Sequence, residues 1–355
     1  MTSLRWLFKA FIIVITFCAI GAGFLYHEIT QPITLTQPQV FEVQKGDTSF
    51  GLGEKLAQRG WITYPFLTRV VAKLHPEWIP KVGQYEITNG MTLLSMMALF
   101  DSGKSIVYTI TLVEGNTLQE YLKAMKAKGN IQMTLEGLSN AQIAKKLGIK
   151  RSNPEGLFFA NTYQYHNNTT DLRILKRAHN LLESHLKAEW ETRDQGLPYK
   201  TPYQALIMAS MIEKETGVPE ERGLIAGVFI NRLHKHMRLQ TDPTVIYGLG
   251  KDYNGTITYK DLRSKSLYNT YLHKGFPPTP ITNVGLRAIV AALHPTKTDD
   301  LYFVAKGDGS HVFSKTLAQH NKAVDEYQMQ RRADYRSSPE PQSVSSSKKE
   351  GETAQ

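Results

Sequence analysis

The chain has 355 residues, of which 41% are hydrophobic and 21% are charged, a composition that excludes a wholly disordered or fibrous protein. At roughly 150 residues per domain, this length predicts about two folded units. Lysine and arginine outnumber aspartate and glutamate by 42 to 32, and the resulting net charge of +10 favours anionic partners. The single cysteine, Cys18, lies in an apolar run, so the sequence offers neither a disulfide framework nor a thiolate site.

An uncharged apolar run extends from Ala10 to Tyr26. At about 1.5 Å per residue, a helix over this run spans about 26 Å, close to the thickness of one bilayer core. Because Arg5 and Lys9 precede the run, and basic residues favour the cytoplasmic side, we expect a cytoplasmic N-terminus and export of everything after His27. Residues 1–27 are predicted to be a retained membrane anchor, and a cleaved signal peptide is the alternative. Export argues against nucleic acid as a partner and favours a cell-wall polymer.

The next part of the chain predicts a small folded module behind a spacer. Residues 28–40 contain Pro32 and Pro38 and are expected to be extended. Residues 41–104 predict an α+β module in which a strand, a turn at 45–47 and a helix capped by Thr48 or Ser49 come first. A second strand at 83–87 and a helix at 91–100 repeat this order.

The remainder, residues 105–336, predicts a larger, mostly helical α+β domain. A strand is expected at 105–113 and a β-hairpin around 306–309. Helical spacing of apolar residues predicts helices at 118–125, 140–147, 170–186 and 203–216. Residues 337–355 have almost no large apolar side chain and predict a disordered tail.

The helix predicted at 203–216 carries the first candidate for chemistry, Glu213. It shares a helical face with apolar Leu206, and desolvation there would raise its pKa, as a general acid working near neutral pH requires. The alternative is a structural Glu213 paired with Arg222 or Arg232, which would lower its pKa.

The following polar segment, residues 238–250, contains three side chains that we expect to line a groove: Gln240, Asp242 and Tyr247. Amides and phenols suit sugar binding because they combine hydrogen bonds with a flat apolar face. The alternative for Asp242 is an ordinary Asp-Pro turn.

No metal or nucleotide cofactor is expected. His234 and His236 are two apart, so they point to different sides of a helix. His311 and His320 lack the spacing of a zinc motif, and no glycine-rich phosphate loop precedes a suitable helix.

Several stretches together resemble the MltG-type (YceG-like) endolytic peptidoglycan transglycosylases. They are ASMIEKET, VFINRLHKHMRLQTDPTVIYGLG, LYNTYLHKGFPPTPITNVGLRAIVAALHP and LYFVAKGDGSHVFSKTLAQHNKAV, and the resemblance covers most of 155–324. The small module resembles a degenerate LysM-type domain. Within 155–163, EGLFFANTY, Ala160 and Asn161 depart from the Pro-Asp expected in that family, which leaves the shape of that loop open.

The resemblance implies a lyase that cleaves the β-1,4 bond between N-acetylmuramic acid and N-acetylglucosamine within glycan strands. It implies 1,6-anhydro ends, termination of nascent strands, a catalytic glutamate at Glu213, and no cofactor. Substrate-binding residues are implied at these positions: Glu215, Gln240, Asp242, Tyr247, Asn269 and Tyr271.

The resemblance also implies a single-pass protein of the bacterial inner membrane with its catalytic domain in the periplasm. Peptidoglycan strands are the implied partner, together with penicillin-binding proteins of the wall-synthesis machinery. Two alternatives stay open: a hydrolytic muramidase with Asp242 or Glu215 as its second carboxyl, and a non-catalytic wall-binding scaffold.

Overall fold

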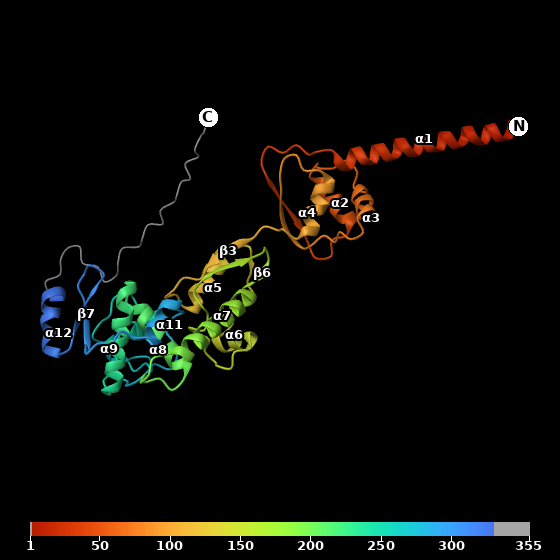
Figure 1. Ribbon diagram of the computed structural model, residues 1–355. Coiled ribbons are helices and arrows are strands. Elements are labelled where there is room, and N and C mark those ends of the chain that lie inside the picture. Colours follow the sequence, from red (N-terminus) through yellow and green to blue (C-terminus); the bar gives the residue numbers. More distant parts are fainter. Residues whose placement is uncertain (1, 330–355) are drawn as a thin grey trace, which may run out of the picture. The chain divides into compact units, whose positions relative to one another are not determined.

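A computed structural model describes residues 2–329, which form two compact units (Figure 1). The small unit comprises residues up to 109 together with 164–169, and the large unit comprises 110–163 and the residues from 170 onwards. Helices predominate, and the strands of the described residues pair into four two-stranded sheets. The expected mixture of helix and strand is therefore confirmed. The tail predicted at 337–355 lies outside the described residues.

The small unit contains the two strand–helix pairs expected from the sequence, with a further helix, α3 (Leu67–Leu74), between them. Its elements are α1 (Thr2–Thr30), β1 (Gln39–Val43), α2 (Ser49–Gln58), α3 (Leu67–Leu74), β2 (Gly83–Ile87) and α4 (Leu93–Ser102). β1 and β2 are antiparallel, with Phe41 opposite Tyr85. The hydroxyl of Thr48 accepts a hydrogen bond from the N–H of Gly51, at 3.1 Å, so Thr48 caps α2. The resemblance of this unit to a LysM-type domain remains a prediction.

The segment predicted as an extended spacer, 28–40, differs from that expectation. α1 continues to Thr30, and Ile29 and Ile33 are only 6% and 8% exposed within the core of the small unit. The N–H of Ile33 donates to the carbonyl oxygen of Met91 at 2.8 Å. Residues 31–38 form neither helix nor strand, and burial of the two isoleucines packs the segment on the unit, so it does not separate the unit from α1. Residues 5–30 are long and apolar enough to cross a membrane, with mean hydropathy 2.2.

The large unit begins within β3, and a hairpin and a short helix lie near its described end. The order of its longer elements is β3 (Tyr108–Thr111), α5 (Leu118–Ala127), β4 (Ile131–Gln132), α6 (Asn140–Leu147), β5 (Thr162–Tyr165), β6 (Thr169–Thr170), α7 (Asp171–Thr192), α8 (Pro202–Glu215), α9 (Arg222–His234), α10 (Asp242–Leu249), α11 (Leu286–Leu293), β7 (Tyr302–Ala305), β8 (His311–Ser314) and α12 (Leu317–Val324). A single 3-10 turn, η1 (Pro219–Glu221), precedes α9. The predicted helices and the hairpin are present, with α7 longer than expected and β3 shorter.

Helix α8 is the centre of this unit. Every residue from Ala205 to Glu213 is buried, and the helix contacts α7, α9, α10 and α11. The β7–β8 hairpin, with Phe303 opposite Phe313, packs against α12, and β7 also contacts α9 (Figure 1). A helix buried on all sides has a fixed position, so the residues at its C-terminal end are held rigidly.

Candidate functional site

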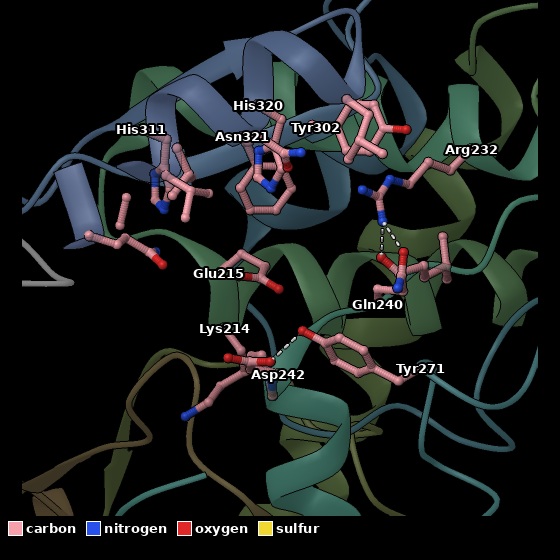
Figure 2. Close-up of a pocket in the computed structure, with 18 residues that line it drawn as sticks. Lys214, Glu215, Arg232, Gln240, Asp242, Tyr271, Tyr302, His311, His320 and Asn321 are labelled. Atoms are coloured by element: carbon pink, nitrogen blue, oxygen red, sulfur yellow. Dashed lines mark hydrogen bonds between the residues drawn. The ribbon is translucent and has the colours of Figure 1, made fainter. Parts of the chain in front are cut away.

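A cavity of about 850 Å³ lies at the C-terminal end of α8 (Figure 2). In Figure 2, Glu215 lies between Asp242 and Tyr271 on one side and His320 of α12 on the other. The lining residues come from α8, α9, α10, the loops before and after α10, the hairpin and the helical segment that follows it: Lys214, Glu215, Arg232, Leu239, Gln240, Asp242, Pro243, Tyr271, Tyr302, Phe303, Val304, Ala305, His311, Leu317, His320, Asn321, Val324 and Gln328.

Glu215, the last residue of α8, is the carboxyl best suited to proton transfer. Its side chain accepts a hydrogen bond from the hydroxyl of Thr241. Burial raises the pKa of Glu215 to about 7; the Thr241 hydrogen bond and the charge of Arg232 oppose this rise, and Asp242 adds to it. A carboxyl that faces a cavity and is partly protonated at neutral pH can act as a general acid.

Asp242 provides a second carboxylate in the same cavity. It is the first residue of α10, with Pro243 in the first turn, so the Asp-Pro pair starts a helix here where the alternative expected an isolated turn. The hydroxyl of Tyr271 donates to Asp242 Oδ1 at 2.6 Å. Burial, and then Asp242, raise the pKa of Tyr271, which keeps its hydroxyl protonated as a donor.

Arg232 holds two walls of the cavity together. It is only 8% exposed, and its Nε donates to the carbonyl oxygen of Leu301 at 2.6 Å, at the start of the hairpin. One terminal nitrogen donates to the carbonyl oxygen of Leu239 at 2.8 Å. The next residue, Gln240, has a φ of 52°, a strained value for a residue with a side chain, so these contacts fix its position.

Glu213 lies two residues earlier on α8 and does not line the cavity. Its side chain is 3% exposed, with Oε1 accepting a hydrogen bond from Arg222 at 3.0 Å and Oε2 accepting one from the N–H of Gly285 at 3.1 Å. Burial raises the pKa of Glu213, while Gly285 and Arg222 oppose that rise. The pairing with Arg222 considered from the sequence is therefore present, and both carboxylate oxygens are already bonded.

Two predicted substrate-binding residues lie outside the cavity lining. Asn269 is fully buried, and its amide donates to the carbonyl oxygens of Leu262 and Ser264 at 3.0 and 2.8 Å. Its Oδ1 accepts the N–H of Tyr271 at 2.9 Å, so Asn269 positions Tyr271. Tyr247 packs edge-to-face on Tyr268, with ring centroids 4.8 Å apart. Gln240, Asp242, Tyr271 and Glu215 are the predicted residues that the fold brings together.

Sequence reasoning missed the wall formed by the hairpin and α12, which contributes Tyr302, His311, His320 and Asn321. His311 Nδ1 lies 2.7 Å from Glu221 Oε2, which ties the hairpin to η1. These residues lie far from Glu215 in the sequence, so no local spacing pattern links them to it. Within residues 2–329, no group of three or more His, Cys, Asp or Glu residues could hold a metal ion, and the absence of a metal stays a prediction.

The cavity thus brings two carboxyl groups, Glu215 and Asp242, together at the end of a buried helix in a mostly helical domain. The YceG-like family matches residues 41–326, and the chain belongs to this family, as its sequence motifs predicted. A 2.6 Å crystal structure of a YceG-like protein from Listeria monocytogenes has 29% sequence identity and a TM-score of 0.52, covering 81% of this chain and 99% of that one.

Two further relatives are endolytic murein transglycosylases. The endolytic murein transglycosylase of Bacillus subtilis (strain 168) is 35% identical over 269 residues, which is 70% of this chain and 73% of the relative. The endolytic murein transglycosylase of Streptococcus pneumoniae (strain D39) is 25% identical over 319 residues, 80% of this chain. The matched part is only 57% of the pneumococcal protein.

Proposed function

We propose that this protein is a membrane-anchored endolytic murein transglycosylase. Its substrate would be the β-1,4 bond between N-acetylmuramic acid and N-acetylglucosamine within glycan strands, and its products would carry 1,6-anhydro ends. Family membership and relatives of this name support the proposal. The structural observation that carries it is the position of Glu215, which ends α8 and lines the cavity, where burial raises the pKa of its carboxyl to about 7.

The reaction needs one carboxyl because the nucleophile belongs to the sugar. Protonated Glu215 donates its proton to the glycosidic oxygen as the bond from that oxygen to C1 breaks. The resulting carboxylate accepts the proton of the muramyl 6-hydroxyl as O6 forms a bond to C1, so Glu215 ends protonated as it began. An intramolecular hydroxyl has a high effective concentration, and no water is consumed.

The sequence pointed to Glu213 for this role, and the geometry favours Glu215. Burial raises the pKa of both carboxyls, but Glu213 is ion-paired with Arg222 and does not line the cavity, whereas Glu215 lines it and can reach a substrate there. We therefore assign the acid–base role to Glu215. Glu213 would support the fold by holding Arg222 and the backbone of Gly285 against the end of α8.

A hydrolytic muramidase is the second candidate, because Asp242 lines the same cavity as Glu215. A hydrolase needs a second carboxylate, either as a nucleophile or to activate water, and Asp242 would supply it. Digestion of purified peptidoglycan by the full chain, followed by mass spectrometry of the product ends, separates the candidates. Anhydro-muramyl ends support the transglycosylase, reducing ends support the hydrolase, and no cleavage supports a wall-binding scaffold.

The proposed location is the bacterial cytoplasmic membrane, with α1 as a single span, a cytoplasmic N-terminus and the large unit outside the cytoplasm. The length and hydropathy of residues 5–30 support this location. From the family resemblance we also propose that the protein terminates nascent strands and associates with penicillin-binding proteins.

A further inference from the structure

We propose that the small unit docks on the outer surface of the bilayer through a patch formed by Tyr64, Phe66, Arg69 and Lys73. The patch would bind the headgroups of anionic phospholipids. The inference goes beyond catalysis and rests on the proposed membrane span of α1. It assigns the small unit a lipid-binding surface in addition to any role with the glycan.

The first observation is that α1 enters the small unit without a flexible joint. Figure 1 shows α1 as one unbroken helix that leads into the unit formed with α2, α3 and α4. Its last turn is part of the core, since Ile29 is 6% exposed and Leu25 packs against the same cluster. α1 also contacts α3 and α4. A span that ends inside the core holds the unit against the membrane surface, because no spacer separates them.

The second observation is an aromatic row that continues from the apolar helix onto the unit. The ring of Phe24, within the apolar run of α1, lies 5.7 Å from the ring of Tyr64, which lies 5.9 Å from the ring of Phe66. Tyr64 and Phe66 remain 39% and 43% exposed. Aromatic side chains are enriched at the membrane–water interface, and Phe24 places this pair at that depth.

The third observation is the charge beside these rings. Arg69 and Lys73 follow Phe66 by three and seven residues, so the three side chains share one face of α3, opposite buried Val71. Arg69 lies over the ring of Phe50 at 4.3 Å. The sequence between Glu54 and Glu77 contains lysine and arginine but no acidic residue. Two basic side chains beside exposed aromatics complement an anionic lipid surface.

The test uses the full chain in vesicles of phosphatidylglycerol and phosphatidylethanolamine, with Cys18 replaced by alanine. A fluorophore is attached to one introduced cysteine, Phe66→Cys, Ile13→Cys or Val107→Cys, and quenching by lipids that carry a nitroxide near the headgroup or in the acyl chain is measured. Val107 is the matched control, an apolar residue of the small unit that is 49% exposed and lies outside the patch. Ile13 reports whether α1 spans the bilayer.

We expect headgroup quenching at position 66 to be about threefold stronger than at position 107, with strong acyl-chain quenching at position 13. Adding Arg69→Glu and Lys73→Glu should lower quenching at 66, as should vesicles of phosphatidylcholine alone, and unchanged quenching in both cases would overturn binding of anionic headgroups by the patch. Equal quenching at 66 and 107, with position 13 in lipid, would overturn the docking and favour a protein partner for the patch. Absence of quenching at 13 would overturn both the span and the docking, while peptidoglycan cleavage would still report separately on Glu215.

Discussion

The two glutamates at the end of α8 should behave oppositely when each is changed to glutamine. Glu215→Gln removes the proton donor but keeps an oxygen that can accept from Thr241, so the fold should persist. Loss of a general acid typically lowers the rate by about 10²–10⁴-fold. Glu213→Gln leaves Arg222 buried, at 8% exposure, without a carboxylate. Breaking a buried ion pair costs about 3–5 kcal/mol, because the remaining charge is uncompensated.

For a domain the size of the large unit, 1 kcal/mol corresponds to about 2–4 °C in Tm. The Glu213→Gln variant should therefore unfold about 6–20 °C below the parent, whereas Glu215→Gln should stay within a few degrees of it. The measurements are thermal unfolding by circular dichroism and the release of anhydro-muramyl products from purified peptidoglycan, on the same preparations. A Glu215→Gln variant that cleaves at the parental rate, beside a stable and inactive Glu213→Gln variant, would refute the assignment to Glu215.

Further outcomes concern pH, the tyrosine of the cavity and the glycine of the EGLFFANTY loop. Burial raises the pKa of Glu215 from 4.5 to about 7, so its stabilising contribution is complete below pH 4.5 and is lost as the pH rises through 7. Urea unfolding should show the parent losing stability over this window relative to Glu215→Gln. Tyr271→Phe removes the 2.6 Å hydrogen bond to Asp242 and should lower product release about tenfold, with Tm nearly unchanged. Gly156→Ala should cost about 2–5 kcal/mol in urea unfolding, because φ is +74° and a Cβ would lie 2.3 Å from Pro280.

For each of these three predictions, one experimental result would contradict the reasoning. Parallel pH curves for the parent and Glu215→Gln would mean that the carboxyl titrates normally. Full activity of Tyr271→Phe would remove the Asp242 contact from the proposed substrate groove. An unchanged unfolding midpoint for Gly156→Ala would show that the loop at 155–163 relaxes without cost.

The elements with strong local patterns were predictable from the sequence. The helix expected at 140–147 is α6, and the strand expected at 83–87 is β2, because the apolar spacing and the flanking turn residues are unambiguous there. The spacer was not predictable in the same way. Pro32 and Pro38 favour an extended chain locally, but the core of the small unit supplies sites for Ile29 and Ile33, and such sites exist only once the unit has folded.

In the cavity as well, local sequence motifs predicted some residues, whereas contacts that depend on tertiary packing were not predictable. Gln240, Asp242 and Tyr271 were expected in the site, and they line the cavity. Arg232 was considered only as a partner for Glu213. Its actual contacts, to the carbonyl oxygens of Leu301 and Leu239, depend on where the hairpin packs. Asn269 was expected to bind substrate, but its buried amide is used to hold the backbone around Tyr271.

The proposed assignment to Glu215 in place of Glu213 would make an apolar helical face alone a weak guide to a catalytic acid. Residues two apart on a helix differ by about 200° in direction, so one of the pair enters the core when the other faces outward. The apolar face that raised the expectation for Glu213 belongs to the core, where Arg222 neutralises the carboxylate. Glu215 is the last residue of α8, where the negative end of the helix dipole further disfavours its ionised form. A proton donor for a polymer needs both desolvation and access, and the end of a buried helix that opens into a cavity supplies both.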